Sequence, residues 1–243
     1  MMKVSKHSSG RLRRCTLTCL LFDRTQLVDL CMSSSSLFRS LDRKAYVDFR
    51  FLNAAHSEAR LKITRKMLVR ILTFYQVMPN FLDFLVLFGS HEHSREKRFS
   101  SFRAESILGD PILSLDSLGR AGKHFQICYN LKGIAMRTEG GTLTATDVSW
   151  STLQAAVHHQ FDISQGCAVW MIARAGWDIK ERIESMTGTG GRTEDREFRT
   201  AAQSFKSSLA VHLLLCHWSS ENWRSHFQWL EDEVRDKVSK CSL

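Results

Sequence analysis

Apolar and polar positions alternate with two different periods along this chain. Residues 124–131 place apolar side chains at every second position, namely Phe125, Ile127, Tyr129 and Leu131. Residues 151–161 repeat this period of two, which is typical of a strand that buries one face. A five-residue connection, 162–166, then leads into 167–173, which is apolar throughout. We therefore expect a β-hairpin whose second strand is central and covered on both faces.

Other segments have helical spacing. Thr64 is suited to cap a helix with one apolar stripe, formed by Met67, Leu68, Ile71, Leu72 and Tyr75. Pro79 suits the first turn of a second helix, 80–88. Three more helices are predicted, over 179–186, 195–217 and 220–240. Two segments are less regular: 49–63 is ambiguous, with a strand that ends at Leu61 and Ile63 as one interpretation, and 91–118 is predicted as a charged loop.

These elements predict a mixed α+β fold, in which helices flank a central mixed sheet with a β-hairpin and two C-terminal helices follow. We expect four parts. Residues 1–45 form a poorly ordered, basic, Ser- and Arg-rich tail, and 46–186 form the α/β domain. Residues 187–194 are a Gly- and Thr-rich linker, and 195–243 are the C-terminal helical segment.

The last predicted helix carries an apolar seam. Its members are spaced four, three, four and four residues apart, at Trp223, Phe227, Leu230, Val234 and Val238. This spacing is close to a heptad, but a sustained coiled coil needs three or four heptads, more than these residues provide. We expect the seam to pack on the domain of its own chain. Self-association through this helix is the alternative.

The net charge of +9 comes from the N-terminal part of the chain. Residues 1–100 hold 18 Lys and Arg against 8 Asp and Glu, whereas residues 101–243 hold 16 against 17. Part of the excess lies in one basic stretch, formed by Arg60, Lys62, Arg65, Lys66 and Arg70. One function to consider is thus a basic interaction module that binds nucleic acid or anionic membrane through residues 1–70. The stretch lacks a specific nucleic-acid motif.

Composition also bears on location. Seven cysteines without a CxxC pair argue against a secreted disulfide framework, so we expect a reducing, cytoplasmic location. The basic N-terminal residues are similar to a mitochondrial presequence, which leaves import as an alternative. The most apolar window, 67–88, contains Arg70, Pro79 and Asp83, so no membrane-spanning segment is predicted and only peripheral membrane contact remains.

Residues with catalytic or metal-binding chemistry do not form a recognisable set. His158 and His159 are neighbours on a predicted strand, so their rings point to opposite faces, and we expect one to face inward and the other solvent. His212 and Cys216 are four residues apart but lie in an apolar run that predicts buried core. Two further groups are interpreted as solvated surface, namely His91 with His93, and Glu231, Asp232, Glu233 and Asp236. We assign no catalytic or cofactor-binding residue, and metal ligands are unknown.

Three stretches resemble a known family: 61–88, 124–135 and 150–183. The most specific pattern consists of Trp150, Ser151, His159, Gln160, Phe161, Asp162, Gly166, Ala168 and Trp170. On these residues the chain resembles the N-terminal soluble domain of the fungal CorA-like Mg²⁺ transporters, over about residues 50–243. The membrane helices of that family and the Gly-Met-Asn signature of classical CorA channels have no counterpart in this sequence.

The resemblance implies a non-enzymatic soluble domain related to the cytosolic part of a divalent-cation transporter. The implied protein is a truncated or stand-alone regulatory homologue that does not conduct ions by itself. The resemblance also implies association with a transporter through the last helix as an alternative to self-association. Weak Mg²⁺ binding is the only ligand binding considered. No catalytic residue is carried over. Trp150 and Trp170 are interpreted as packing anchors, Asp162 as the residue that opens a turn, and Gly166 as the turn glycine.

Overall fold

A mixed β-sheet forms the centre of the structure. The computed structural model describes residues 16–19, 47–57, 59–89, 100–109, 122–138, 148–175, 178–198 and 200–241. The strands within these ranges are β1 (Thr16–Cys19), β2 (Val47–Ala54), β3 (Phe102–Ile107), β4 (His124–Thr138), β5 (Val148–Asp162) and β6 (Ala168–Ala175). They form a six-stranded sheet in the order β1-β2-β6-β5-β4-β3. β2 is parallel to β1 and β6, and the remaining neighbours are antiparallel.

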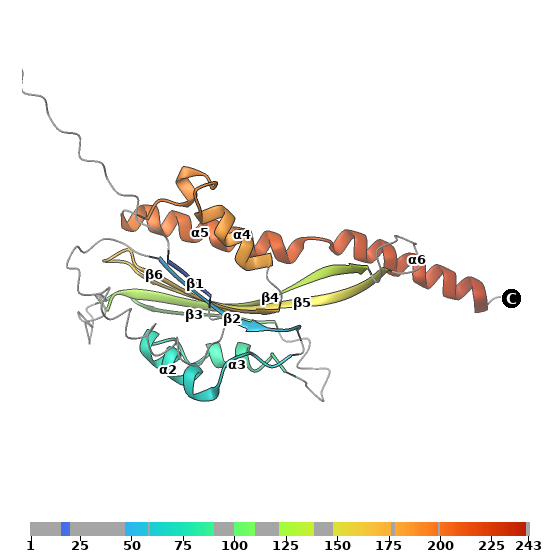
Figure 1. Cartoon of the computed structure of the whole chain (residues 1–243), viewed down its shortest axis with the longest axis horizontal. Helices are drawn as coiled ribbons and strands as arrows, with labels where there is room; N and C mark the ends of the chain where they lie inside the picture. Colours follow the sequence, from blue (N-terminus) through green and yellow to red (C-terminus); the bar gives the residue numbers. More distant parts are fainter. Residues whose placement is uncertain are drawn as a thin grey trace, which may run out of the picture.

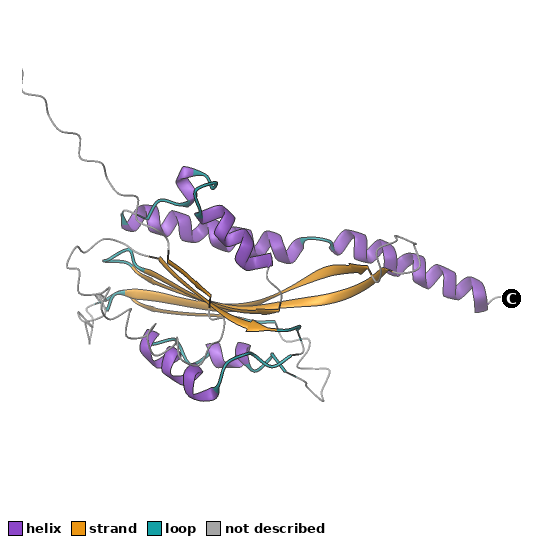
Figure 2. Cartoon of the chain, viewed as in Figure 1, coloured by secondary structure: helices purple, strands orange, loops and turns teal. Residues whose placement is uncertain are grey.

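Helices cover both faces of this sheet. The helices of the described ranges are α2 (Arg65–Tyr75), α3 (Phe81–Leu85), α4 (Asp178–Thr187), η3 (Thr193–Asp195), α5 (Ala201–Ser220) and α6 (Trp223–Cys241). Figure 1 shows α2 and α3 on one face and α4 and α5 on the other, with α6 running on past the ends of β4 and β5. Figure 2 shows the same three layers by element type. The predicted mixed α/β fold is confirmed.

Two apolar cores lie between the layers, and β6 contributes to both. Met171 and Ala173 belong to the core beneath α2 and α3, whereas Trp170 and Ile172 belong to the core beneath α4 and α5. Because successive side chains of a strand point to opposite faces, a strand covered on both faces needs apolar residues throughout. β6 lies between β2 and β5, which confirms the prediction that 167–173 is a central strand.

The β5–β6 turn is held by its own side chains. The Asp162 carboxylate accepts hydrogen bonds from the backbone N–H groups of Ser164 (3.0 Å) and Gln165 (2.8 Å). Gly166 has φ +68°, a left-handed conformation that favours glycine. A Cβ at Gly166 would lie 2.6 Å from Ala201 Cα, so the glycine also lets α5 begin directly against the turn. The roles expected for Asp162 and Gly166 are confirmed.

Three expectations for the irregular segments are wrong. The strand predicted to end at Leu61 and Ile63 ends at Ala54, and the described residues 55–57 and 59–63 belong to no helix or strand. The helix predicted over 80–88 is shorter, Phe81–Leu85. The loop predicted over 91–118 contains β3, whose six residues are all exposed. As an edge strand it buries neither face, and so it lacks the alternation that identifies a strand.

The helix boundaries follow from caps. The Thr64 hydroxyl accepts from Met67 N (3.3 Å) and begins α2, as predicted. Thr200 and Gln203 form a capping box, so α5 begins at Ala201, later than the predicted residue 195.

Where the structure is described, no helix is both long enough and apolar enough to cross a membrane.

Candidate functional site

His158 and His159 point to opposite faces of β5, as predicted, but neither meets solvent. The exposed fractions of the two residues are 0% and 1%. His158 Nε2 is hydrogen-bonded to Gln126 Oε1 (2.9 Å) on the side of α3, where its ring lies 5.3 Å from that of Phe81. His159 lies on the side of α5. The expectation that one ring is solvated is wrong, because helices cover both faces of β5.

A chain of hydrogen bonds runs through the core beneath α5. It joins the Tyr129 hydroxyl to His212 Nδ1 (2.7 Å) and His212 Nε2 to His159 Nδ1 (3.0 Å). The His159 ring stacks on Trp170 with centroids 4.0 Å apart. Burial lowers the pKa of His212 to about 4. Burial, followed by the nearby His212 and His158, holds the pKa of His159 well below its usual value, so both rings are neutral at neutral pH.

The two buried histidines are expected to make the fold less stable at acid pH. Because the folded pKa of each ring is lower than its unfolded value of about 6.5, the unfolded chain binds more protons below pH 6.5. We expect the free energy of unfolding to fall as the pH decreases from 6.5 to 4.5, with about 1–2 kcal/mol of that fall due to His212. Denaturant titrations across this range measure it. His212→Leu should reduce the dependence of the free energy of unfolding on pH. His56→Leu, at an exposed histidine, is the control and should leave that dependence unchanged. The same pH dependence in both variants would contradict the role given to His212.

The other candidate metal ligands of the described residues do not form a group of three or more. His212 is hydrogen-bonded to Tyr129 and His159 in the core, and Cys216, one turn further along α5, is exposed, so these two residues supply no more than a pair of ligands. In the acidic stretch of α6, Asp232 pairs with Arg235 (3.0 Å) and Glu233 with Lys237 (3.4 Å). Within the described ranges, no three His, Cys, Asp or Glu side chains could hold an ion together. His91 and His93 lie outside those ranges.

The connection between α5 and α6 is fixed by an ion pair that the sequence does not reveal. Arg182 of α4 donates two hydrogen bonds to the carboxylate of Glu221, at 2.5 and 2.7 Å. These bonds lower the pKa of Glu221. Asn222 follows with φ +65°, and its amide donates to the Ile134 carbonyl of β4 (3.1 Å). These contacts fix the direction in which α6 leaves the sheet and its covering helices.

The first turn of α6 packs on the β4–β5 hairpin. The Trp150 ring of β5 lies 5.2 Å from that of His226. Trp223 lies 6.2 Å from the same imidazole, and its indole N–H donates to the Ser219 carbonyl of α5 (2.8 Å). Trp150 and Trp170 both act as packing anchors, as expected, but they anchor different helices. Trp150 supports α6, whereas Trp170 lies beneath α5.

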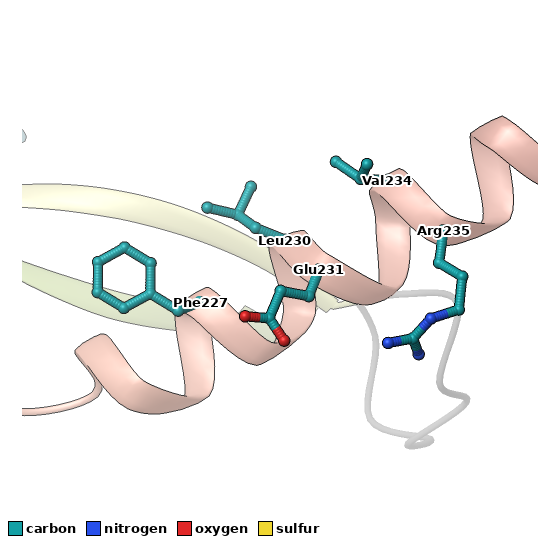
Figure 3. A pocket seen from close by; sticks show the side chains of 5 residues that line it. All are labelled: Phe227, Leu230, Glu231, Val234 and Arg235. Carbon is teal, nitrogen blue, oxygen red and sulfur yellow. The ribbon is translucent and has the colours of Figure 1, made fainter.

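Beyond this turn the apolar seam of α6 is uncovered. Its side chains are exposed to the following extents: Phe227 54%, Leu230 39%, Val234 60% and Val238 60%. The expectation that the seam packs on its own domain is wrong, since α6 has no buried residue and continues past the sheet. Figure 3 shows Phe227, Leu230 and Val234 projecting along one side of the helix, with Glu231 and Arg235 beside them. These five residues line an open groove.

The fold and this seam define a class of protein: a mixed α/β body that carries a projecting helix with an uncovered apolar side. A family model of CorA-like transporters matches residues 20–242, and the chain therefore belongs to this family. The match includes both the α/β body and α6. No curated protein and no solved structure matches the chain.

Proposed function

We propose that this chain is a non-enzymatic, regulatory member of the CorA-like family. It acts on divalent-cation transport by joining its α6 helix to the corresponding helix of another CorA-like chain, in the simplest case a second copy of itself. The observation that carries this proposal is the exposure of the seam at Phe227, Leu230, Val234 and Val238. Burying such a side chain contributes about 1.5–3 kcal/mol, so pairing two seams is a sufficient driving force.

The contacts that hold the beginning of α6 support this role. The Arg182–Glu221 pair and the Trp150–His226 contact hold the beginning of α6 on the body. The later seam residues, Phe227, Leu230, Val234 and Val238, are exposed. Figure 1 shows α6 running on past the ends of β4 and β5, where a second helix can reach it. The groove on α6 is open and mainly apolar, which suits contact with the apolar side of another helix.

Regulation can be measured in cells that lack their own Mg²⁺ uptake and express a full-length CorA-like transporter. We expect co-expression of this chain to change the rate of Mg²⁺ uptake by at least about twofold, and expression of the chain without the transporter to give no uptake. The variant Leu230→Glu/Val234→Glu should leave the transporter at its basal rate. A rate that is the same with and without the chain would refute the proposed regulation.

Weak Mg²⁺ binding belongs to the same proposal. Arg235 and Lys237 already engage the nearby carboxylates of α6, and Mg²⁺ retains much of its hydration shell in protein sites. We therefore propose loose, millimolar binding through water and no tight site. The cytoplasmic location remains a prediction.

A further inference from the structure

A second surface lies on the opposite side of the sheet from α5. Residues 59–89, which include α2 and α3, hold five cations and one acidic residue, Asp83. The cations are Arg60, Lys62, Arg65, Lys66 and Arg70, and all five are exposed. Within the described part of the chain, no acidic side chain forms an ion pair with any of them. We call this surface the basic face.

Apolar side chains accompany these charges on the outer side of the layer. Val69, Leu82 and Val86 are 53%, 46% and 63% exposed. On α2, Val69 lies among Arg65, Lys66 and Arg70 on the exposed side, opposite the buried Ile71. The basic face thus combines positive charge with protruding aliphatic groups.

The loop before α2 and the segment after α3 lie together. A Cβ at Gly89 would be 3.8 Å from Arg60 Cγ, so the end of the α3 segment meets the cationic loop. The first turn of α2 contains no acidic residue to offset the positive end of the helix dipole. Figure 1 shows α2 and α3 in one layer, on the face of the sheet away from α4 and α5. The positive charge therefore belongs to one layer of the fold.

We propose that the basic face binds an anionic lipid surface. Lys and Arg near such a surface are attracted to its acidic headgroups, and aliphatic side chains enter the boundary between headgroups and acyl chains. Single-stranded nucleic acid needs exposed aromatic rings on which bases stack. The aromatic residues of this layer face the core instead, with Tyr75, Phe81, Phe84 and Phe88 buried and Phe74 partly buried. The charges and the aliphatic groups together thus favour lipid over single-stranded nucleic acid.

The test is co-sedimentation of the full chain with vesicles of phosphatidylcholine containing about 30% phosphatidylserine, and with pure phosphatidylcholine vesicles. We expect binding only to the anionic vesicles, and a steep loss of binding between 50 and 300 mM salt, on the order of tenfold or more. Lys66→Glu/Arg70→Glu should reduce the partition coefficient by at least about tenfold. Circular dichroism verifies that the variant is folded.

The matched control is Arg192→Glu/Lys206→Glu, which makes the same charge change at exposed positions on the α5 side. It should retain at least about half of the binding. If both variants lost vesicle binding equally, the binding would depend on net charge alone. If Lys66→Glu/Arg70→Glu retained vesicle binding, the lipid would bind at another surface. Either result overturns the proposal. Retention on poly(U) RNA without binding to anionic vesicles would overturn it in favour of nucleic acid. The seam of α6 is unchanged in these variants, so the regulatory proposal is tested separately.

Discussion

Replacing Gly166 with alanine is expected to lower the free energy of unfolding by about 2–5 kcal/mol. A left-handed backbone costs a residue with a Cβ about 1–2 kcal/mol, and forcing a new atom into a packed region costs about 1–3 kcal/mol more. Both costs apply here, because φ is +68° and the new Cβ would lie 2.6 Å from the backbone of Ala201. Denaturant unfolding followed by circular dichroism measures the change.

Gly190 provides the matched control for this substitution. A Cβ at Gly190 meets no atom within 4 Å. Gly190→Ala should therefore change the free energy of unfolding by less than about 1 kcal/mol. If the two alanine variants were equally stable, the close approach of α5 to the β5–β6 turn would be refuted.

Placing two glutamates on the seam of α6 should weaken association by at least about a hundredfold. Leu230→Glu/Val234→Glu removes the apolar contacts of both partners and would bury charges that have no counter-charge. Because each 1.4 kcal/mol is a tenfold change in affinity, losing two side chains from each partner is sufficient for this effect. Sedimentation velocity over a concentration series measures the dissociation constant.

The control for this pair is Ser225→Glu/Gln228→Glu. It adds two glutamates to exposed positions of the same helix, away from the seam. We expect it to associate within about threefold of the unmodified chain. A similar loss of association in both variants would mean that the added charge, and not the seam, is responsible.

The central hairpin could be predicted from the sequence because burial dictates its pattern. Phe161 and Val157 alternate with residues that face the other side, and the continuous apolar run of β6 follows from its central position. β3 was not predicted because an exposed edge strand has no such alternation of buried and exposed residues. Its pairing with β4 is a long-range property that residues 102–107 do not encode alone.

The candidate site was predicted only in part. The spacing of the seam is a local property and could be found in the sequence. Which surface it faces depends on how α6 leaves the body, and that direction is set by Glu221, Asn222 and their distant partners Arg182 and Ile134. The buried state of His159 likewise depends on α5, which brings His212 to it from far along the chain.

The central claim is that a second copy of this chain covers the seam of α6. Multi-angle light scattering of the purified full chain, from about 1 to 100 µM, tests this claim most directly. We predict a mass that rises with concentration to at least twice the 27.9 kDa of one chain. A constant mass of 27.9 kDa over the whole range would contradict self-association through the seam.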